Sequence, residues 1–293
     1  MECGQGGRGW ESVGLIVGEY INMSIGPLAY IPQTQPKIPE CVHRLAQGSL
    51  IEAVWVNGVG GVTYRIAARQ GNAGRYVKYA ALGTPESDFV REATRLRWAG
   101  QYCNVPQVLE VGEDELGSWL VTRAIEGASA VAPRWIGQPE VAAHALGVGL
   151  RALHDALPVT DCEFSWSVSD RLKGFEQRIA SGESPDDWSA EYSRLGVNNV
   201  RELLRNPPAL DKLVVCHGDA CAPNTLLDDV GNFAGHVDMG ELGVADRWAD
   251  LTIAAWSTEW NYGAGYEQLV YQGYGIEAEP ERISYYRMLW DLT

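Results

Sequence analysis

The sequence contains no uninterrupted apolar run near the ~18 residues that a membrane-spanning helix requires. It is also poor in basic residues, with 23 Lys and Arg against 38 Asp and Glu, so that the net charge is −15. A field of this sign repels nucleic acid and anionic lipid and attracts polycations, although an acidic surface also simply favours solubility. We therefore expect neither a membrane nor a nucleic-acid partner.

Cysteine is sparse, and its six residues form no C-x-x-C pair of the kind found in metal sites and redox motifs. Scattered free thiols are usual in a reducing compartment. The N-terminus lacks the basic region and long apolar segment of a signal peptide, so we expect a cytoplasmic protein. We expect residues 1–40 to form an N-terminal extension, rich in glycine at first, which is either disordered or shorter because the true start is Met23.

Between residues 50 and 122 the chain alternates short β-rich runs with turn residues, which predicts strands. One helix interrupts them, with Thr84 as its N-cap and Pro85 at its first position. The apolar residues Phe89, Ala93 and Leu96 fall on one face of this helix. The expected strands cover residues 54–56, 64–67, 75–79, 108–111 and 118–122.

Beyond residue 126 the pattern becomes helical. The elements that we expect there are a helix at 141–157, a strand at 213–215, a hairpin at 225–227 and 233–237, and helices from 249 on. The sequence therefore predicts an α+β fold with two lobes. A small β-rich N-terminal lobe would cover residues 41–124, and a larger, mainly helical C-terminal lobe would cover residues 125–293.

An H-G-D segment ending at Asp219 is followed five residues later by Asn224, and then by a D-M-G segment beginning at Asp238. Phosphoryl transfer needs a carboxylate that orients the attacking hydroxyl, oxygen ligands for Mg²⁺, and positive charge on the phosphates. A lone H-G-D is most simply a turn. The ordered combination, with each part after a short apolar strand, instead predicts a catalytic base at Asp219 and metal ligands at Asn224 and Asp238.

Gly58, Gly60 and Gly61 lie between two β-rich runs. Glycine lets the backbone approach phosphate oxygens closely, although a hairpin turn is the simpler interpretation of this cluster alone. The order of the next residues favours a nucleotide site, because Lys78 lies in the following strand and Glu92 on the helix after it. In kinases such a Lys contacts the phosphates and is held by the helix Glu, whereas elsewhere a strand Lys often just extends to solvent.

The segment 214–250 resembles the catalytic core of the aminoglycoside phosphotransferases, which are relatives of the protein kinases. The runs VVCHGDACAPNTLLD and GHVDMGELGVADRWADL are similar to the branch that acts on 3′ or 3″ hydroxyls, including streptomycin 3″-phosphotransferases. The resemblance implies a bilobal protein-kinase-like fold, ATP and Mg²⁺ as cofactors, and resistance through inactivation of the antibiotic. It also implies that Asp250 braces the catalytic loop and that the backbone of Arg123 and Ala124 meets the purine. We further expect a monomer or weak dimer.

Aminoglycosides are polycations, so their site should combine acidic groups with aromatic faces. We expect Trp256, Glu259, Trp260 and Asp291 to contact the acceptor, although each acid alone is more simply a surface charge and each Trp a core residue. Asp291 stands where the family uses a C-terminal acid to bind ammonium groups. Further candidates are Glu163, Glu267 and Tyr262.

Two departures from the kanamycin-type 3′ enzymes bear on the acceptor. Those enzymes usually carry an Arg where this chain has Trp256, and they usually end in Asp-Glu-aromatic-aromatic, where it reads W-D-L-T. Planar guanidinium groups stack well on indole rings. We therefore favour streptomycin, phosphorylated at its 3″ hydroxyl, over a kanamycin or neomycin acceptor phosphorylated at the 3′ hydroxyl.

Three other functions fit parts of the pattern. A different small hydroxylated metabolite is compatible with the same catalytic loop. A peptide kinase is disfavoured because the stretch 238–250 is short and no A-P-E motif follows it. A pseudokinase that acts as a binding module is disfavoured because Lys78, Asp219 and Asp238 are all present.

Overall fold

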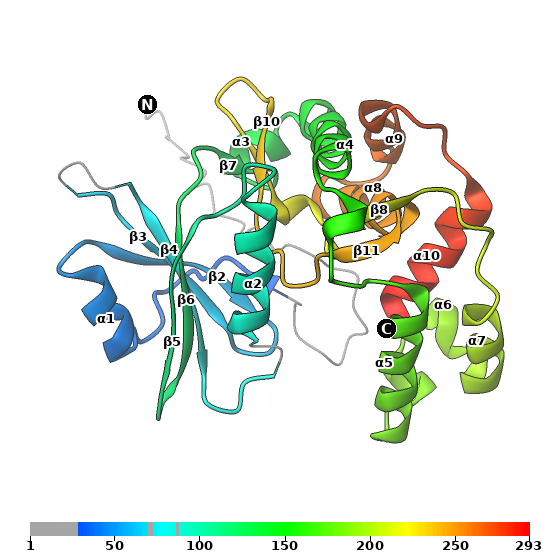
Figure 1. Cartoon of the computed structure of the whole chain (residues 1–293), viewed down its shortest axis with the longest axis horizontal. Coiled ribbons are helices and arrows are strands. Elements are labelled where there is room, and N and C mark those ends of the chain that lie inside the picture. Colours follow the sequence, from blue (N-terminus) through cyan, green and yellow to red (C-terminus); the bar gives the residue numbers. More distant parts are fainter. Residues whose placement is uncertain (1–28, 70–72, 86–87) are drawn as a thin grey trace, which may run out of the picture.

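The computed structural model describes residues 29–69, 73–85 and 88–293, which form two lobes (Figure 1). The N-terminal lobe is built on a six-stranded antiparallel sheet with strand order β1-β2-β3-β4-β6-β5. The strands are β1 (Ala29–Tyr30), β2 (Ile51–Asn57), β3 (Val62–Ile66), β4 (Arg75–Ala81), β5 (Val108–Asp114) and β6 (Gly117–Arg123). The five strands predicted from the sequence are confirmed as β2 to β6.

Two helices cover opposite faces of this sheet (Figure 1). α1 (Glu40–Ala46) buries Val42 and Leu45 in a small core that it shares with the sheet. α2 (Phe89–Ala99) packs on β5 and β6 from the side of the C-terminal lobe, and its Leu96 belongs to the main core of that lobe. The residues of α2 are therefore well placed to contribute to a site between the lobes.

The start of α2 differs from the prediction that Thr84 and Pro85 begin it. The N-cap is Asp88, whose carboxylate accepts the backbone N–H of Arg91 at 2.8 Å. Thr84 donates its own backbone N–H to the carbonyl of Ala81 at 3.0 Å, which closes a turn after β4. Thr and Asp both cap helices, and the hydrogen bonds of the fold decide which of the two does so here.

Part of the expected N-terminal extension contacts the sheet. β1 pairs with the end of β2. The side-chain amide of Gln35 accepts the backbone N–H of Ala53 at 2.6 Å and donates to its carbonyl at 3.3 Å. Residues 29–40 therefore pack with the N-terminal lobe, whereas the rest of the predicted extension, including Met23, lies outside the described residues.

The C-terminal lobe is mainly helical, as predicted. Its helices are α3 (Pro133–Ile136), α4 (Pro139–Ala156), α5 (Val168–Ala180), α6 (Ala190–Ser193), α7 (Gly196–Leu204), α8 (Trp248–Tyr262), α9 (Glu267–Tyr274) and α10 (Pro280–Leu292). Two small sheets, β10-β9-β7 and β11-β8, complete the lobe. Their strands are β7 (Ala128–Ser129), β8 (Leu213–Cys216), β9 (Thr225–Leu227), β10 (Phe233–His236) and β11 (Gly243–Asp246).

Two glycines bring α4 and α9 into direct backbone contact. A Cβ atom at Gly147 would lie 2.0 Å from the carbonyl oxygen of Val270, and one at Gly273 would lie 2.1 Å from that of His144. Any larger residue would push the helices apart, because packed interiors do not absorb such overlaps. α4 also contacts β8, β9 and β10, so this helix pair supports the strands that precede Asp219 and Asp238.

Candidate active site

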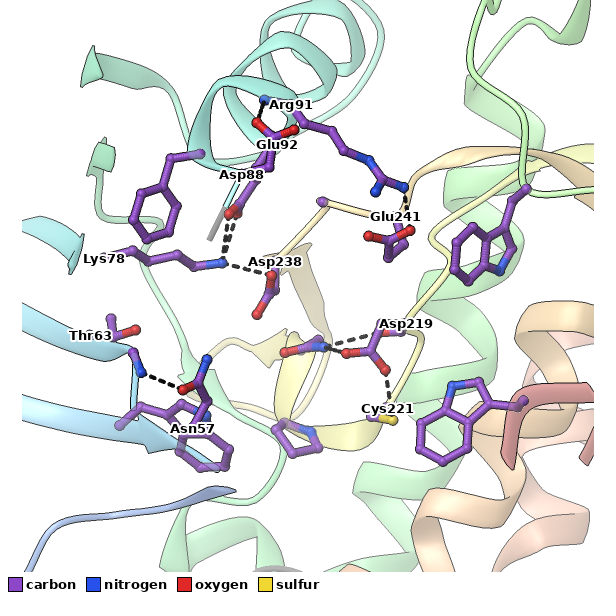
Figure 2. A pocket seen from close by; sticks show the side chains of 18 of the residues that line it. Asn57, Thr63, Lys78, Asp88, Arg91, Glu92, Asp219, Cys221, Asp238 and Glu241 are labelled. Atoms are coloured by element: carbon purple, nitrogen blue, oxygen red, sulfur yellow. Dashed lines mark hydrogen bonds and ion pairs between the residues drawn. The ribbon is translucent and has the colours of Figure 1, made fainter. Parts of the chain in front are cut away.

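A cavity of about 770 Å³ lies between the lobes. Lys78 from β4 and Glu92 from α2 line one side, and Asp219, Asn224 and Asp238 from the segments after β8 and β10 line the other. Figure 2 shows the side chains of Lys78, Glu92, Asp219 and Asp238 directed toward one another around the cavity. Residues predicted from separate parts of the sequence thus meet in one place.

Lys78 bridges the two lobes. Its Nζ lies 2.8 and 2.9 Å from the two carboxylate oxygens of Glu92 and 2.7 Å from Oδ1 of Asp238. Burial alone would lower the pKa of Lys78, but the carboxylates of Asp238 and Glu92 outweigh it and hold the pKa above its usual value. The lysine therefore stays charged, as a contact with phosphate requires.

Asp238 follows β10 in a conformation that few residues adopt. Its φ of 63° lies in the left-handed region, which is uncommon outside glycine and is often found at functional sites. Burial alone would raise the pKa of Asp238, but the charge and hydrogen bond of Lys78 outweigh it and hold the pKa below its usual value. The carboxylate is therefore charged and directed into the cleft.

Asp219 is held by hydrogen bonds to both carboxylate oxygens. Asn224 Nδ2 donates to Oδ2 and to the backbone carbonyl of Asp219, each at 3.0 Å, and the thiol of Cys221 donates to Oδ1 at 3.0 Å (Figure 2). Burial raises the pKa of Asp219 and the nearby Asp238 adds to this, while the Cys221 thiol opposes it; the pKa lies above its usual value. Because Asn224 uses its amide nitrogen here, its amide oxygen remains for another partner.

Asp250, in the first turn of α8, anchors the catalytic loop. Its carboxylate accepts the backbone N–H groups of His217 at 2.6 Å and Gly218 at 2.9 Å, and His154 Nε2 lies 3.0 Å from its Oδ2. The carboxylate is almost fully buried. These hydrogen bonds confirm the bracing role that the family resemblance implied for Asp250.

The glycine-rich turn joins β2 to β3. Gly61 lines the cavity, and its backbone N–H donates to the side-chain oxygen of Asn57 at 2.5 Å. Gly58 and Gly60 lie exposed at the tip of the turn, with Gly60 at a φ of 101° that favours glycine. Their contact with nucleotide phosphates stays a prediction.

The predicted hinge follows β6. The backbone N–H of Arg123 donates to the carbonyl of Gln107, and that of Ala124 donates to Gly74, both at 2.9 Å. Arg123 and Ala124 line a second cavity of about 420 Å³ rather than the main one. Both amides are already used within the protein, so a purine contact of this backbone stays a prediction.

A model of the phosphotransferase enzyme family matches residues 63–286, which include Lys78, Asp219 and Asp238. The chain belongs to this family. The phosphotransferase therefore uses ATP to phosphorylate a hydroxyl group, and the enzyme class predicted from the sequence is confirmed.

The phosphotransferase has named relatives on both acceptor branches. An aminoglycoside 3′-phosphotransferase of Streptomyces fradiae is 33% identical over 252 residues, which are 76% of this chain and 92% of the relative. The streptomycin 3″-kinase of Streptomyces griseus is 30% identical over 260 residues, covering 82% and 92%.

A solved relative shares the fold of the phosphotransferase. It is the aminoglycoside phosphotransferase APH(3″)-Id from Streptomyces rimosus in complex with ADP and streptomycin, with a TM-score of 0.62 and 26% identity. The match covers 79% of this chain and 90% of that one. The bilobal kinase-like α+β fold expected from the sequence is therefore confirmed. No helix in the described ranges has the length and apolar character needed to span a membrane.

Only one of the four predicted acceptor residues lines the main cavity of the phosphotransferase. Trp260 does so together with Trp290, and their ring centroids are 5.5 Å apart. Trp256 packs behind them, with centroids 4.8 Å from Trp260 and 6.0 Å from Trp290. The guanidinium group of Arg287 lies 5.3 Å from the ring centre of Trp256, so a cation of the protein itself already occupies this face.

The predicted acidic residues lie outside the lining of this cavity. Burial and the neighbouring Glu267 raise the pKa of Glu259, while Glu267 itself pairs with Arg287. Asp291 contacts Ser189, and burial raises its pKa. Acceptor contacts of Trp256, Glu259 and Asp291 therefore stay predictions that require the surrounding side chains to rearrange.

The remaining sequence candidates are likewise outside the lining. Glu163 is exposed to solvent, and the hydroxyl of Tyr262 donates to the backbone carbonyl of Ala130 at 3.0 Å.

Several cavity residues escaped the sequence interpretation. They are Arg91, Trp166, Asp170, Arg171, Trp290 and Glu241. None belongs to a motif with fixed spacing. Two of them nevertheless lie beside residues that the sequence singled out. Trp290 immediately precedes Asp291, and Glu241 immediately follows the D-M-G segment. Their position next to recognised residues was the one feature of the sequence that could have indicated a place in the cavity.

Proposed function

We propose that this phosphotransferase transfers the γ-phosphoryl group of ATP to a hydroxyl group of an aminoglycoside antibiotic and thereby inactivates it. The observation that carries the proposal is the excess of acidic side chains around the catalytic residues. A polycation gains from such a site because opposite charges attract more strongly where water is partly excluded. The acidic lining residues are Asp88, Glu92, Asp170, Asp219, Asp238 and Glu241, and the basic ones are Lys78, Arg91 and Arg171.

Mg²⁺ fits the residues of this cleft. The carboxylate of Asp238 and the amide oxygen of Asn224, left over once its nitrogen bonds Asp219, are hard oxygen ligands of the kind that Mg²⁺ prefers. The ion would neutralise charge on the nucleotide phosphates. Asp219 accepts the proton of the acceptor hydroxyl, and Lys78 contacts the phosphates of the donor.

Replacing Asp238 with asparagine should raise the Mg²⁺ concentration for half-maximal activity by more than about tenfold, because a charged ligand is lost. Asn224→Ala should have the smaller effect of the two. A Mg²⁺ titration of the ATP-dependent rate measures both, and Asp228→Asn in the β9–β10 turn is the control. Unchanged Mg²⁺ dependence in Asp238→Asn would remove it from the metal site.

Within the aminoglycosides we propose streptomycin as acceptor, phosphorylated at its 3″ hydroxyl. The support is the indole pair of Trp260 and Trp290 in the cavity that holds Asp219. Guanidinium groups, which streptomycin carries, stack on indole faces more readily than ammonium groups do.

Replacing Trp260 with alanine should raise the KM for streptomycin several-fold and leave the KM for ATP within about twofold, since one cation–π contact is worth ~0.5–2 kcal/mol. Trp290→Ala should act in the same direction. Tyr102→Ala, an exposed aromatic outside the cavity, serves as control. An unchanged streptomycin KM in both tryptophan variants would limit these rings to a packing role.

A kanamycin-type acceptor phosphorylated at its 3′ hydroxyl is the second candidate, favoured by the 33% identity to the 3′ enzyme. Coupled ATP turnover with streptomycin, kanamycin and neomycin, followed by NMR of each product, distinguishes the two. Turnover of kanamycin without turnover of streptomycin would overturn the streptomycin proposal.

We further propose a cytoplasmic monomer or weak dimer, and the free thiols of the described cysteines suit that location.

A further inference from the structure

Arg91, in the first turn of α2, places a guanidinium group in the cleft. It forms an ion pair with Glu241, which follows the D-M-G segment, and both side chains line the main cavity. Figure 2 shows this pair on one side of Asp238 and Lys78 on the other. The side chains of Arg91 and Glu241 are 40% and 35% exposed, so either can change partner without crossing a packed core.

Glu241 lies directly against the catalytic loop. Gly218 has a φ of 88°, and a Cβ atom there would lie 2.3 Å from the carbonyl oxygen of Glu241. Gly218 immediately precedes the base Asp219. Glu241, the partner of Arg91, therefore packs against the loop that carries Asp219.

Three guanidinium groups act on the single carboxylate of Glu241, because Arg95 and Arg171 lie near it as well as Arg91. Arg95 is fixed, since its Nε donates to the carbonyl of Leu242 at 2.7 Å. Arg171 is buried and donates to the hydroxyl of Thr293 at 2.8 Å.

Asp88, which caps α2, and Asp170 line this part of the acidic cleft as well, but the three guanidinium groups act together on the place that Glu241 occupies. That place therefore suits an anion. The anion that a phosphotransferase brings to this point is the phosphoryl group of its donor.

We propose that Arg91 is a catalytic residue that exchanges Glu241 for the oxygens of the transferring phosphoryl group. In that step the acceptor oxygen bonds to Pγ, the bond from Pγ to the bridging oxygen of ADP breaks, and Asp219 takes the hydroxyl proton. A guanidinium group can donate two parallel hydrogen bonds to phosphoryl oxygens, which favours the charge that develops on them. Before the donor binds, the ion pair with Glu241 holds the Arg91 guanidinium group close to the place that the phosphoryl group will occupy.

The competing interpretation is that the pair only holds the two lobes together. Arg91→Gln and Glu241→Gln would then act alike, since each removes the ion pair. If Arg91 contacts the phosphoryl group, the two variants differ, because Glu241→Gln keeps the guanidinium group.

The test measures kcat and KM, and also the affinities for Mg·ADP and for Mg·ADP with fluoroaluminate, an analogue of the transferring phosphoryl group. Arg91→Gln should lower kcat and fluoroaluminate affinity by ~10²-fold, as the loss of one preorganised donor does, and change Mg·ADP affinity by less than about twofold. Arg91→Lys should recover part of both. The fold-decrease in kcat for Glu241→Gln should be at least about ten times smaller than that for Arg91→Gln. Arg97→Gln, exposed on the same helix, is the matched control.

Equal losses in Arg91→Gln and Glu241→Gln, or unchanged fluoroaluminate affinity in Arg91→Gln, would overturn the proposal. Hydrolysis of ATP without acceptor is measured beside transfer to streptomycin. A failure to phosphorylate any aminoglycoside would therefore count against the proposed function alone, while the hydrolysis rates still decide the role of Arg91.

Discussion

Replacing Asp219 with asparagine is expected to lower kcat by ~10²- to 10⁴-fold and to leave the affinity for ATP nearly unchanged, because a positioned base typically contributes this much. Asparagine has almost the same shape as aspartate, but it cannot accept the hydroxyl proton. The position of the carboxylate is well defined, since the Cys221 thiol and the Asn224 amide each donate to one of its oxygens at 3.0 Å. The variant thus removes the proton acceptor with little change in shape.

Steady-state turnover and nucleotide binding by calorimetry measure the two halves of this prediction. Asp229→Asn is the matched control, because Asp229 is fully exposed in the β9–β10 turn and outside the cavity. Turnover close to that of the unmodified enzyme in Asp219→Asn would show that another group takes the proton. A large loss of ATP affinity would instead place Asp219 in nucleotide binding.

The meeting of the candidate catalytic residues could be predicted because the spacings within each of the two segments that carry them are short. Asp219 and Asn224 share one loop, and the D-M-G segment follows on the next hairpin. Lys78 and Glu92 are only 14 residues apart, on a strand and the helix after it. Such short spacings limit the relative positions that the two side chains of each pair can take, so that each pair can reach the cavity together.

The part of the cavity that we propose for the acceptor could not be predicted in the same way. It is built from α5, α8 and α10, which lie far apart in the sequence and meet only in the folded C-terminal lobe. Charge and aromatic character did not show that Trp256 stacks with Arg287 or that Asp291 contacts Ser189. Trp290, which does line the cavity, was marked in the sequence only by its position next to Asp291.

Local signals also competed at the start of α2. Thr84 with Pro85 and Asp88 are both acceptable helix starts. The N-cap in the structure is Asp88, and Thr84 instead closes the turn after β4. The same cap places Arg91 in the first turn of α2, where its side chain reaches Glu241 across the cleft.

Replacing Asp250 with asparagine is expected to destabilise the fold by about 3 kcal/mol, which corresponds to ~5–10 °C in Tm, and to lower kcat. The buried carboxylate accepts two backbone N–H groups of the catalytic loop and contacts His154. An amide offers one oxygen, so at least one of these donors would face the new NH₂ group. A buried donor without an acceptor costs ~1–3 kcal/mol, and the loop that carries Asp219 loses part of its support.

The same carboxylate predicts a pH dependence. Burial alone would raise the pKa of Asp250, but the hydrogen bond and charge of His154, with the loop amides, outweigh it and hold the pKa below its usual value. A carboxyl group whose pKa is lower in the folded state stabilises the fold above its unfolded-state pKa of about 3.9. That stabilisation is lost as the pH falls further, toward the folded-state pKa. The unmodified enzyme should therefore lose stability below about pH 4 more steeply than Asp250→Asn does.

Urea unfolding at pH 7 and between pH 3 and 5 measures both effects. Asp155→Asn, which removes an exposed carboxylate on α4 that pairs with Arg151, should change the unfolding free energy by less than about 1 kcal/mol. An Asp250→Asn variant as stable as this control would mean that the loop amides find other acceptors. If the unfolding free energy of Asp250→Asn fell with decreasing pH as steeply as that of the unmodified enzyme, the stability loss at low pH would come from other carboxylates. If Asp250→Asn instead lowers both the stability and its dependence on pH, the Asp250 side chain couples the fold of the C-terminal lobe to the position of the proposed base Asp219.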